Sequence, residues 1–192
     1  MKLGIIIGST REGRSTDRAA KWVATVANTL EGVEVTMLDL RGYDLPMFNE
    51  AVSPQYNPAR NPEGVVKQWL DALASQDAFI VVTPEYNRSI PAVLKNALDY
   101  VAYEMEKKPV GIVAHGSTNG AQAVSHLRGI IPGVLAISVP KAVFAPMAGS
   151  AFDENGVLNA DIAANPHGPA GALNAMLADL VWYADALVAA KQ

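Results

Sequence analysis

Three short polar segments carry the residues whose types and spacing could do chemistry. The first, residues 8–17 (GSTREGRSTD), follows an apolar run at 2–7 and precedes a stretch with helical periodicity. A turn between a strand and a helix points free backbone N–H groups and the positive end of the helix dipole at one spot. Side chains add further donors and positive charge: Ser9, Arg11, Arg14, Ser15 and Thr16. The segment is therefore predicted to bind an anion, and phosphate is its natural occupant.

The same segment comes close to a P-loop for nucleoside triphosphates. Residues 8–15 read G-x-x-x-x-G-R-S, with Arg14 at the position of the lysine that reaches the β- and γ-phosphates. No G-x-G-x-x-G dinucleotide motif occurs there. A P-loop hydrolase, which would bind ATP or GTP with Mg²⁺, therefore stays a weaker alternative, beside an ordinary polar turn with solvated arginines.

The other two segments suit a flat heteroaromatic ligand. Residues 83–89 (TPEYNRS) offer backbone donors and acceptors, an aromatic ring and an amide. Residues 115–120 (HGSTNG) offer backbone amides and small residues that let a ring approach closely. Taken singly, Tyr86 would be a half-buried turn residue and Glu85 a carboxylate favoured by a helix dipole. Three such segments at adjacent strand ends favour one shared site.

The elements that must position these segments alternate along the chain. Strands are predicted at 2–7, 33–40, 78–82, 109–114 and 134–139, the last continuing through 142–144. Helical periodicity lies between them, including 65–73 and a helix at 90–103 that begins with Ser89 as cap and Pro91 in its first turn. This alternation predicts an α/β fold, a five-stranded parallel sheet with helices on both faces. In the order 2-1-3-4-5, the strands before the three segments are neighbours, and ligands bind beyond their carboxyl ends.

Composition limits the classes of protein that need to be considered. With 192 residues, half of them apolar and 18% charged, residues 1–192 are expected to form one globular domain. A net charge of −4 without a basic block argues against nucleic acid as a partner. The absence of cysteine excludes disulfides and thiolate sites. No signal-peptide pattern and no apolar run of bilayer length are evident, so we expect a cytoplasmic protein without a membrane partner.

The remaining titratable residues do not suggest metal or acid–base chemistry. The three histidines, His115, His126 and His167, lack metal-ligand spacing. His115 is expected at a strand end near the ligand. Glu85 and Asp99 could be proposed as an acid–base pair, but a capping carboxylate and a surface partner of Lys95 at i,i+4 are the simpler roles.

Three stretches carry a family resemblance. Residues 8–15, residues 83–100 (TPEYNRSIPAVLKNALDY) and residues 152–158 (FDENGVL) resemble the NADPH-dependent FMN reductases of the flavodoxin-like superfamily. That group includes azoreductase, chromate reductase and quinone reductase relatives. The resemblance implies a flavodoxin-like three-layer sandwich and a homodimer or homotetramer. The apolar segment 45–48 is a candidate subunit contact, unless it packs on its own domain.

The resemblance also implies a cofactor, FMN, and a set of residues around it. The phosphate would be held by Ser9, Arg11, Ser15 and Thr16. The isoalloxazine would be lined by Pro84, Glu85, Tyr86 and Asn87, and its other polar edge would be covered by Ser117 and Gly120. Ala121 after Gly120 departs from the double glycine common in the family.

The implied reaction is hydride transfer from NADPH or NADH to FMN, followed by reduction of a small acceptor such as a quinone, azo compound, metal oxyanion or flavin. The flavin carries that chemistry, so no side chain is named as catalytic. A flavodoxin-type electron carrier is the alternative. Flavodoxins tend to be strongly acidic and to bind FMN through a loop without arginines, so Arg11, Arg14 and the modest net charge favour the reductase.

Overall fold

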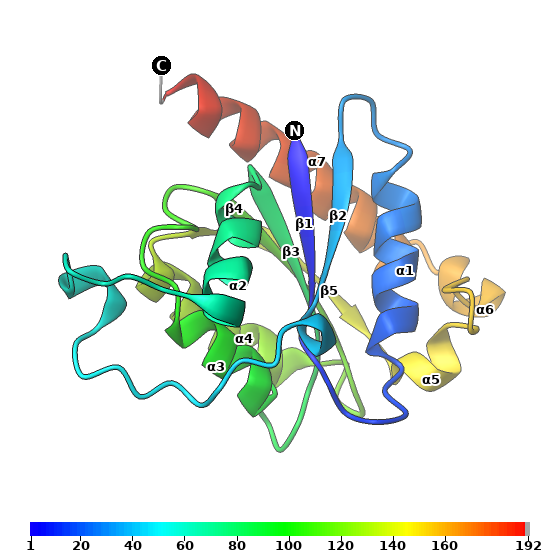
Figure 1. The fold of residues 1–192 in the computed structure, drawn as a ribbon. Helices are drawn as coiled ribbons and strands as arrows, with labels where there is room; N and C mark the ends of the chain where they lie inside the picture. Colours follow the sequence, from blue (N-terminus) through cyan, green and yellow to red (C-terminus); the bar gives the residue numbers. More distant parts are fainter. Residues whose placement is uncertain (191–192) are drawn as a thin grey trace.

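The computed structural model describes residues 1–190, and its centre is one five-stranded parallel sheet (Figure 1). The strands are β1 (Lys2–Ile7), β2 (Glu34–Asp39), β3 (Ala78–Pro84), β4 (Pro109–His115) and β5 (Ile137–Ala145). Their order is β2-β1-β3-β4-β5, which confirms the predicted sheet.

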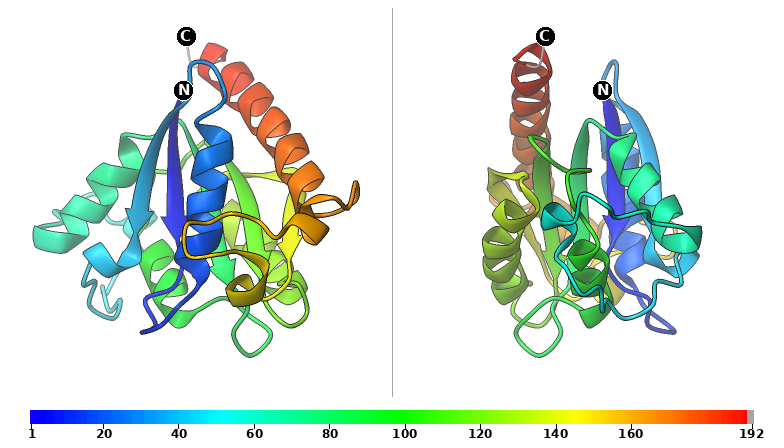
Figure 2. Two further views of the ribbon diagram at one scale, coloured as in Figure 1. Left: turned by 90° about the vertical axis from the view of Figure 1, so that its right-hand side faces the viewer. Right: turned by 60° about the vertical axis from the view of Figure 1, so that its left-hand side comes forward.

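Helices cover both faces of the sheet, so the molecule has three layers (Figures 1 and 2). One face carries α1 (Thr16–Ala27) and α7 (Pro169–Ala189), and the other carries α2 (Gly64–Ala74), α3 (Ala92–Asp99) and α4 (Ala121–Ile130). Two short helices, α5 (Ala148–Ala151) and α6 (Ala160–Ala163), follow β5 on the side of α1 (Figure 1). Short 3₁₀ turns occupy Leu40–Gly42, Pro54–Tyr56 and Ile131–Val134.

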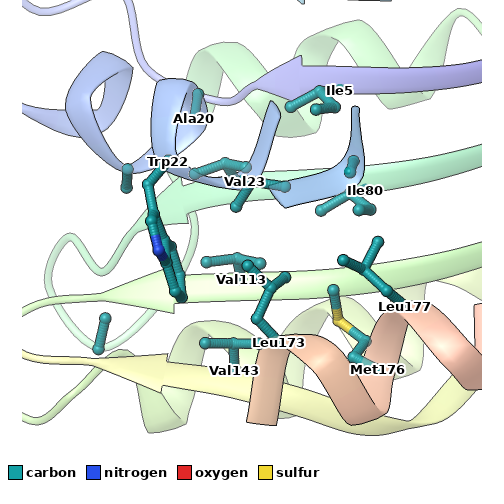
Figure 3. Packing of buried hydrophobic residues seen from close by; sticks show 14 of the residues in the cluster. Ile5, Ala20, Trp22, Val23, Ile80, Val113, Val143, Leu173, Met176 and Leu177 are labelled. Atoms are coloured by element: carbon teal, nitrogen blue, oxygen red, sulfur yellow. The ribbon is translucent and has the colours of Figure 1, made fainter. Parts of the chain in front are cut away.

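The side chains of β1 alternate between two hydrophobic cores. Ile5 packs toward α1 and α7, whereas Ile6 packs toward α2 and α3. Figure 3 shows the first core, where Val23 of α1 and Met176 of α7 meet strand side chains such as Ile80. Because both faces are buried, the central strands are continuous apolar runs rather than alternating ones.

Helix α7 corrects one expectation. By length and composition it is apolar enough to cross a bilayer, which no stretch of the sequence was expected to be. One face of the helix is nevertheless fixed on the sheet by buried residues, namely Leu173, Met176, Leu177, Leu180 and Ala184. Packing of this kind is also typical of a core helix in a globular domain.

Two element boundaries differ from the predictions. Strand β5 begins at Ile137, because Val134 ends a 3₁₀ turn and Leu135 adopts a positive φ of 61°. Helix α3 ends at Asp99 and begins after Pro91, so Ser89 is not its cap.

The carboxyl ends of four neighbouring strands, β1, β3, β4 and β5, lie at one edge of the sheet. Pro84 of β3 pairs with His115 of β4, and His115 pairs with Ala145 of β5. Ile7 at the end of β1 pairs with Val82 of β3. The loops that leave these residues therefore start side by side, as the sequence predicted for the first, third and fourth strands.

The segment 45–48 packs largely on its own domain. Leu45 and Phe48 contact the core between the sheet and α3, and the Phe48 ring lies 5.2 Å from that of Tyr100. Asn96 accepts a hydrogen bond from the Phe48 N–H and donates one to the Pro46 carbonyl, both at 2.8 Å. Pro46 and Met47 are exposed, and Met47 is 75% exposed.

Candidate functional site

The first loop leaves β1 at Gly8, where a side chain would crowd its neighbours. The Gly8 N–H donates to the Val82 carbonyl at 2.8 Å, which ties the loop to β3. A Cβ at this position would lie 2.9 Å from Leu94 Cδ2 and 3.2 Å from the Val82 carbonyl oxygen. The loop ends at Ser15, the N-cap position of α1, whose own hydroxyl makes no capping hydrogen bond.

The second loop is fixed to the first through Tyr86. Its hydroxyl lies 2.9 Å from that of Ser9, which is fully buried. The exposed guanidinium of Arg11 lies 5.7 Å from the centre of the Tyr86 ring, within the range of a cation–π contact. Ser9 therefore contacts Tyr86 rather than the cleft itself, whereas the Arg11 guanidinium is exposed at the rim of the cleft.

Arg14, expected to add charge for an anion, is occupied elsewhere. Its side chain is 4% exposed and donates to both carboxylate oxygens of Asp39, at 2.7 and 2.5 Å. It also donates to the Ser9 carbonyl. Burial by itself would raise the pKa of Asp39, but hydrogen bonds from Arg14 and the Arg41 N–H, with the charge of both arginines, lower it overall. The Asp39 carboxylate is therefore ionised. It forms an ion pair with Arg14, the residue at the position of the P-loop lysine.

Residues 86–89 form a tight hairpin turn. The N–H groups of Tyr86 and Ser89 each donate to the carbonyl of the other at 2.9 Å. Asn87 and Arg88 between them have positive φ angles of 49° and 68°, the pattern of a type I′ turn. The Ser89 hydroxyl, freed from any capping role, lies 2.9 Å from His126 Nδ1.

Glu85 links the second loop to the third. Its N–H donates to the His115 carbonyl at 2.9 Å, and its carboxylate accepts from Thr118 Oγ1 at 2.6 Å and from the Gln122 N–H at 2.9 Å. The Thr118 hydrogen bond is the main reason that the pKa of Glu85 is lowered, against a smaller opposing effect of burial. This side chain is a capping carboxylate for α4, the simpler of its two expected roles. Asp99 likewise pairs with Lys95 at 2.5 Å.

The third loop depends on glycine at both ends. Gly116 has a φ of 156°, and Gly120 has a φ of 75° at the start of α4. A Cβ on Gly120 would lie 2.5 Å from Ala114 Cβ and 2.7 Å from the His115 N atom. Gly120 thus shapes the loop by close backbone packing.

His115 and Thr16 form a buried contact beneath the loops. His115 Nε2 lies 3.0 Å from Thr16 Oγ1, and the two residues are 5% and 1% exposed. Burial lowers the pKa of His115 to about 4, so the imidazole is neutral near pH 7. The neutral imidazole can orient the Thr16 hydroxyl by a hydrogen bond, but it adds no positive charge that would attract an anion.

A cleft of about 230 Å³ opens where the loops meet. Seven of the expected ligands line it, namely Arg11, Ser15, Thr16, Pro84, Glu85, Tyr86 and Ser117. Ser9, Asn87 and Gly120 do not. Gly116 of the third loop also lines the cleft, whereas sequence reasoning missed Met147 and Ala148, which enter from the segment after β5. The position of β5 beside β4 in the predicted sheet was the signal that could have found them.

Backbone donors without an acceptor lie in the loops that form the cleft. Within residues 1–190, the N–H groups of Thr10, Arg11 and Glu12 in the first loop have no acceptor, and neither do those of Asn87 and Ser117 in the other two. The first set suits a phosphate at the start of α1. The second set, next to the Tyr86 ring, suits the polar edge of a flat ring. The residues present therefore fit FMN. No group of three His, Asp or Glu side chains in the described part of the chain could hold a metal ion.

Known proteins share this architecture. A family model described as NADPH-dependent FMN reductase matches residues 1–150. An NAD(P)H-dependent FMN reductase of Schizosaccharomyces pombe is 33% identical over 66% of this chain, and the chain spans 64% of that protein. An FMN-dependent NADPH-azoreductase of Staphylococcus haemolyticus is 30% identical, with 74% of this chain and 76% of that protein covered. The structure of FerB, a flavoenzyme NAD(P)H:(acceptor) oxidoreductase from Paracoccus denitrificans, superposes with a TM-score of 0.73 at 24% identity, covering 95% and 96% of the two chains.

Proposed function

The chain belongs to the NADPH-dependent FMN reductase family, and from that premise we propose that it is an FMN-dependent NAD(P)H oxidoreductase that reduces small acceptors. The observation that carries the proposal is the cleft, which is lined by the Tyr86 ring and by Arg11 and Ser117, whose backbone N–H groups have no acceptor in the described chain. When bound there, FMN would take a hydride from the nicotinamide and pass reducing equivalents to an acceptor such as a quinone, azo compound, metal oxyanion or free flavin.

The phosphate end is proposed to lie against the first loop. Arg11 supplies charge at the rim, and Ser15 and Thr16 supply hydroxyls at the start of α1. The Thr16 hydroxyl is oriented by the neutral His115 at 3.0 Å. Ser9 contributes indirectly, because its hydroxyl lies against that of Tyr86.

The ring end is proposed to lie among Pro84, Glu85, Tyr86, Asn87, Ser117 and Gly120. Since the N–H groups of Glu85 and Tyr86 already donate within the protein, the ring is proposed to use N–H groups without an acceptor in the described chain, such as those of Asn87 and Ser117. Glu85 acts by joining the two loops, and Gly120 by fixing the turn into α4. Neither role requires proton transfer, so we assign no catalytic acid or base.

The nicotinamide donor is proposed to be NADPH or NADH. Two arginines in the first two loops, Arg14 and Arg88, are compared as contacts for the 2′-phosphate of NADPH. Arg14 is buried against Asp39, whereas Arg88 is exposed at the tip of the turn that lines the site. Arg88 is therefore the better candidate for selecting NADPH.

We further propose a homodimer or homotetramer. The cleft of about 230 Å³ is smaller than the sites of roughly 300–1,000 Å³ that enclose small ligands, so a second subunit could cover what this chain leaves open. An apolar groove between α3 and α4, which includes Ile90 and Ile130, adjoins the turn at Ser89 and is a better contact surface than segment 45–48. Replacing Ser125 in this groove with arginine should yield monomers in sedimentation experiments, whereas Ala160→Arg on exposed α6 should not. Wild-type protein that is monomeric at working concentration would refute the proposal.

A cytoplasmic, soluble protein with small-molecule partners fits these features best. The net charge of −4 disfavours nucleic acid, and one face of α7 is engaged by the sheet rather than free for lipid. Membrane flotation and fractionation of the expressed protein test this location directly.

Steady-state NADPH oxidation tests the enzyme assignment. Without oxygen and with FMN equimolar to the protein, repeated NADPH oxidation should require an added acceptor such as a quinone or azo dye, and omission of FMN should abolish the reaction. Binding of FMN without turnover would instead support the flavodoxin-type electron carrier.

A further inference from the structure

Two arginines outside the cleft hold three consecutive carbonyl groups of the first loop. Arg14 donates to the Ser9 carbonyl through Nη1. Arg41 donates to the Thr10 carbonyl at 3.4 Å through Nε and to the Arg11 carbonyl at 2.5 Å through Nη2. Both arginines are bound by Asp39, the last residue of β2, so all three carbonyls point toward that end of β2.

The direction of each carbonyl group also sets the direction of the N–H group of the next residue. In a trans peptide the C=O of one residue and the N–H of the next point to opposite sides, and residues 1–190 contain no cis peptide bond. The N–H groups of Thr10, Arg11 and Glu12 therefore point away from Arg14 and Arg41. None of these three donors has an acceptor in the described chain. Successive unpaired N–H groups on one side of a loop form an anion-binding concavity.

Asp39 fixes the arginines in turn. Its two oxygens accept from Arg14 at 2.7 and 2.5 Å, and Oδ1 also accepts from the Arg41 N–H at 2.9 Å. The planar fork of Arg14 spans both the carboxylate and the Ser9 carbonyl, which a lysine ammonium does not match. The end of β2 thereby sets the shape of the loop after β1.

We propose that Arg14 and Arg41 are positioning residues that select a phosphorylated flavin over an unphosphorylated one, by orienting the loop N–H groups without touching the phosphate. This inference rests on the proposed FMN-binding function. It assigns Arg14 a role other than the expected one, since Arg14 binds a carbonyl and a carboxylate rather than the anion.

The test compares dissociation constants for FMN and riboflavin, which differ only by the phosphate. Arg41→Ala, at an exposed residue, should raise the Kd for FMN about tenfold, the size expected for lost charge-assisted hydrogen bonds, and leave the Kd for riboflavin unchanged. Arg14→Lys should do the same although it keeps the charge. Arg18→Ala, which removes a positive charge from α1 and a contact to the Phe152 carbonyl but none to a carbonyl of the first loop, is the matched control and should bind FMN like the wild type.

Two results would overturn the proposal: an equal loss for both flavins, which indicates general damage, or unchanged FMN binding in Arg41→Ala. Should Arg14→Lys fail to fold, the Arg41 variant carries the test alone. Inorganic phosphate separates this proposal from the enzyme assignment. If phosphate raises the melting temperature of the wild type but not of Arg41→Ala, the loop mechanism stands even where FMN does not bind. If the wild type responds to neither FMN nor phosphate, both proposals fail.

Discussion

The hydroxyl groups of Ser9 and Tyr86 lie 2.9 Å apart, although 77 positions separate the two residues in the sequence. Ser9 is fully buried, and Tyr86 lines the cleft. One contact thus joins the loop proposed for the phosphate to the loop proposed for the ring, so the two cannot move independently without breaking it.

Removing either hydroxyl should therefore cost stability in a coupled way. Ser9→Ala and Tyr86→Phe should each lower the free energy of unfolding by about 1 kcal/mol, because each leaves the partner hydroxyl unpaired. The double variant should lose about 1 kcal/mol less than the sum of the two. Urea unfolding measures all four proteins. Tyr56→Phe, at a tyrosine 79% exposed, should be neutral. Strictly additive losses would show that the contact contributes nothing.

Gly120 should not tolerate a side chain. Gly120→Ala combines a φ of 75° with a Cβ only 2.5 Å from Ala114 Cβ, so we expect a loss of about 2–4 kcal/mol in unfolding free energy. Gly133→Ala is the control, because nothing lies within 4 Å of its Cβ and its φ is not positive. It should gain about 0.4–1 kcal/mol. Equal stability of both variants would refute the role given to Gly120.

His115 should make stability depend on pH. The pKa is lowered by burial from 6.5 to about 4, so the unfolded chain binds more protons than the folded one between these values. Stability should therefore fall as pH falls through that window, by about 2 kcal/mol between pH 7 and pH 5. His115→Gln should remove this loss in urea unfolding at the two pH values.

The exposed His167 supplies the comparison, and His167→Gln should keep the full pH dependence. Asp39 and Glu85 do not contribute to the expected change in stability between pH 7 and pH 5. Their pKa values are lowered from 3.8 and 4.5, so their contributions are lost only as pH falls below about those values. A His115→Gln variant with the wild-type slope between pH 7 and pH 5 would contradict the assignment.

Arg88 should set the preference for NADPH over NADH. Arg88→Gly keeps the turn, because glycine adopts a φ of 68° without steric cost, and it removes the exposed charge. The NADPH/NADH ratio of kcat/KM should fall about tenfold, as expected for one lost charge-assisted hydrogen bond to a phosphate. Asn87→Gly changes the same turn without changing charge and should leave the ratio alone. An unchanged ratio in Arg88→Gly would mean that another residue discriminates.

Apolar runs and loop composition carried the prediction of the fold. Strands such as 2–7 and 109–114 are buried on both faces, so their hydrophobicity alone located them. The start of β5 was harder to see. Pro140 and Lys141 interrupt its apolar run, and a shift of register opposite Val110 and Ile112 absorbs them at the edge of the sheet.

Site residues that belong to one loop could be predicted from the sequence. Contacts between residues far apart in the sequence could not. The loop of Arg11, Ser15 and Thr16 is local and was located. The engagement of Arg14 by Asp39 crosses 25 positions between two strand ends, and a polar loop with two arginines gives no sign of which one is buried. Met147 reaches the cleft only because β5 lies beside β4.

Anaerobic reduction by NADPH, with no partner protein present, is the most direct test of an FMN-dependent oxidoreductase. The visible absorption of protein-bound FMN is recorded before NADPH, after NADPH, and after addition of a quinone. Rapid bleaching followed by recovery with the quinone is the result we predict. Bound FMN that stays oxidised would contradict the reductase and favour an electron carrier, and failure to bind FMN at all would remove the flavin from the cleft.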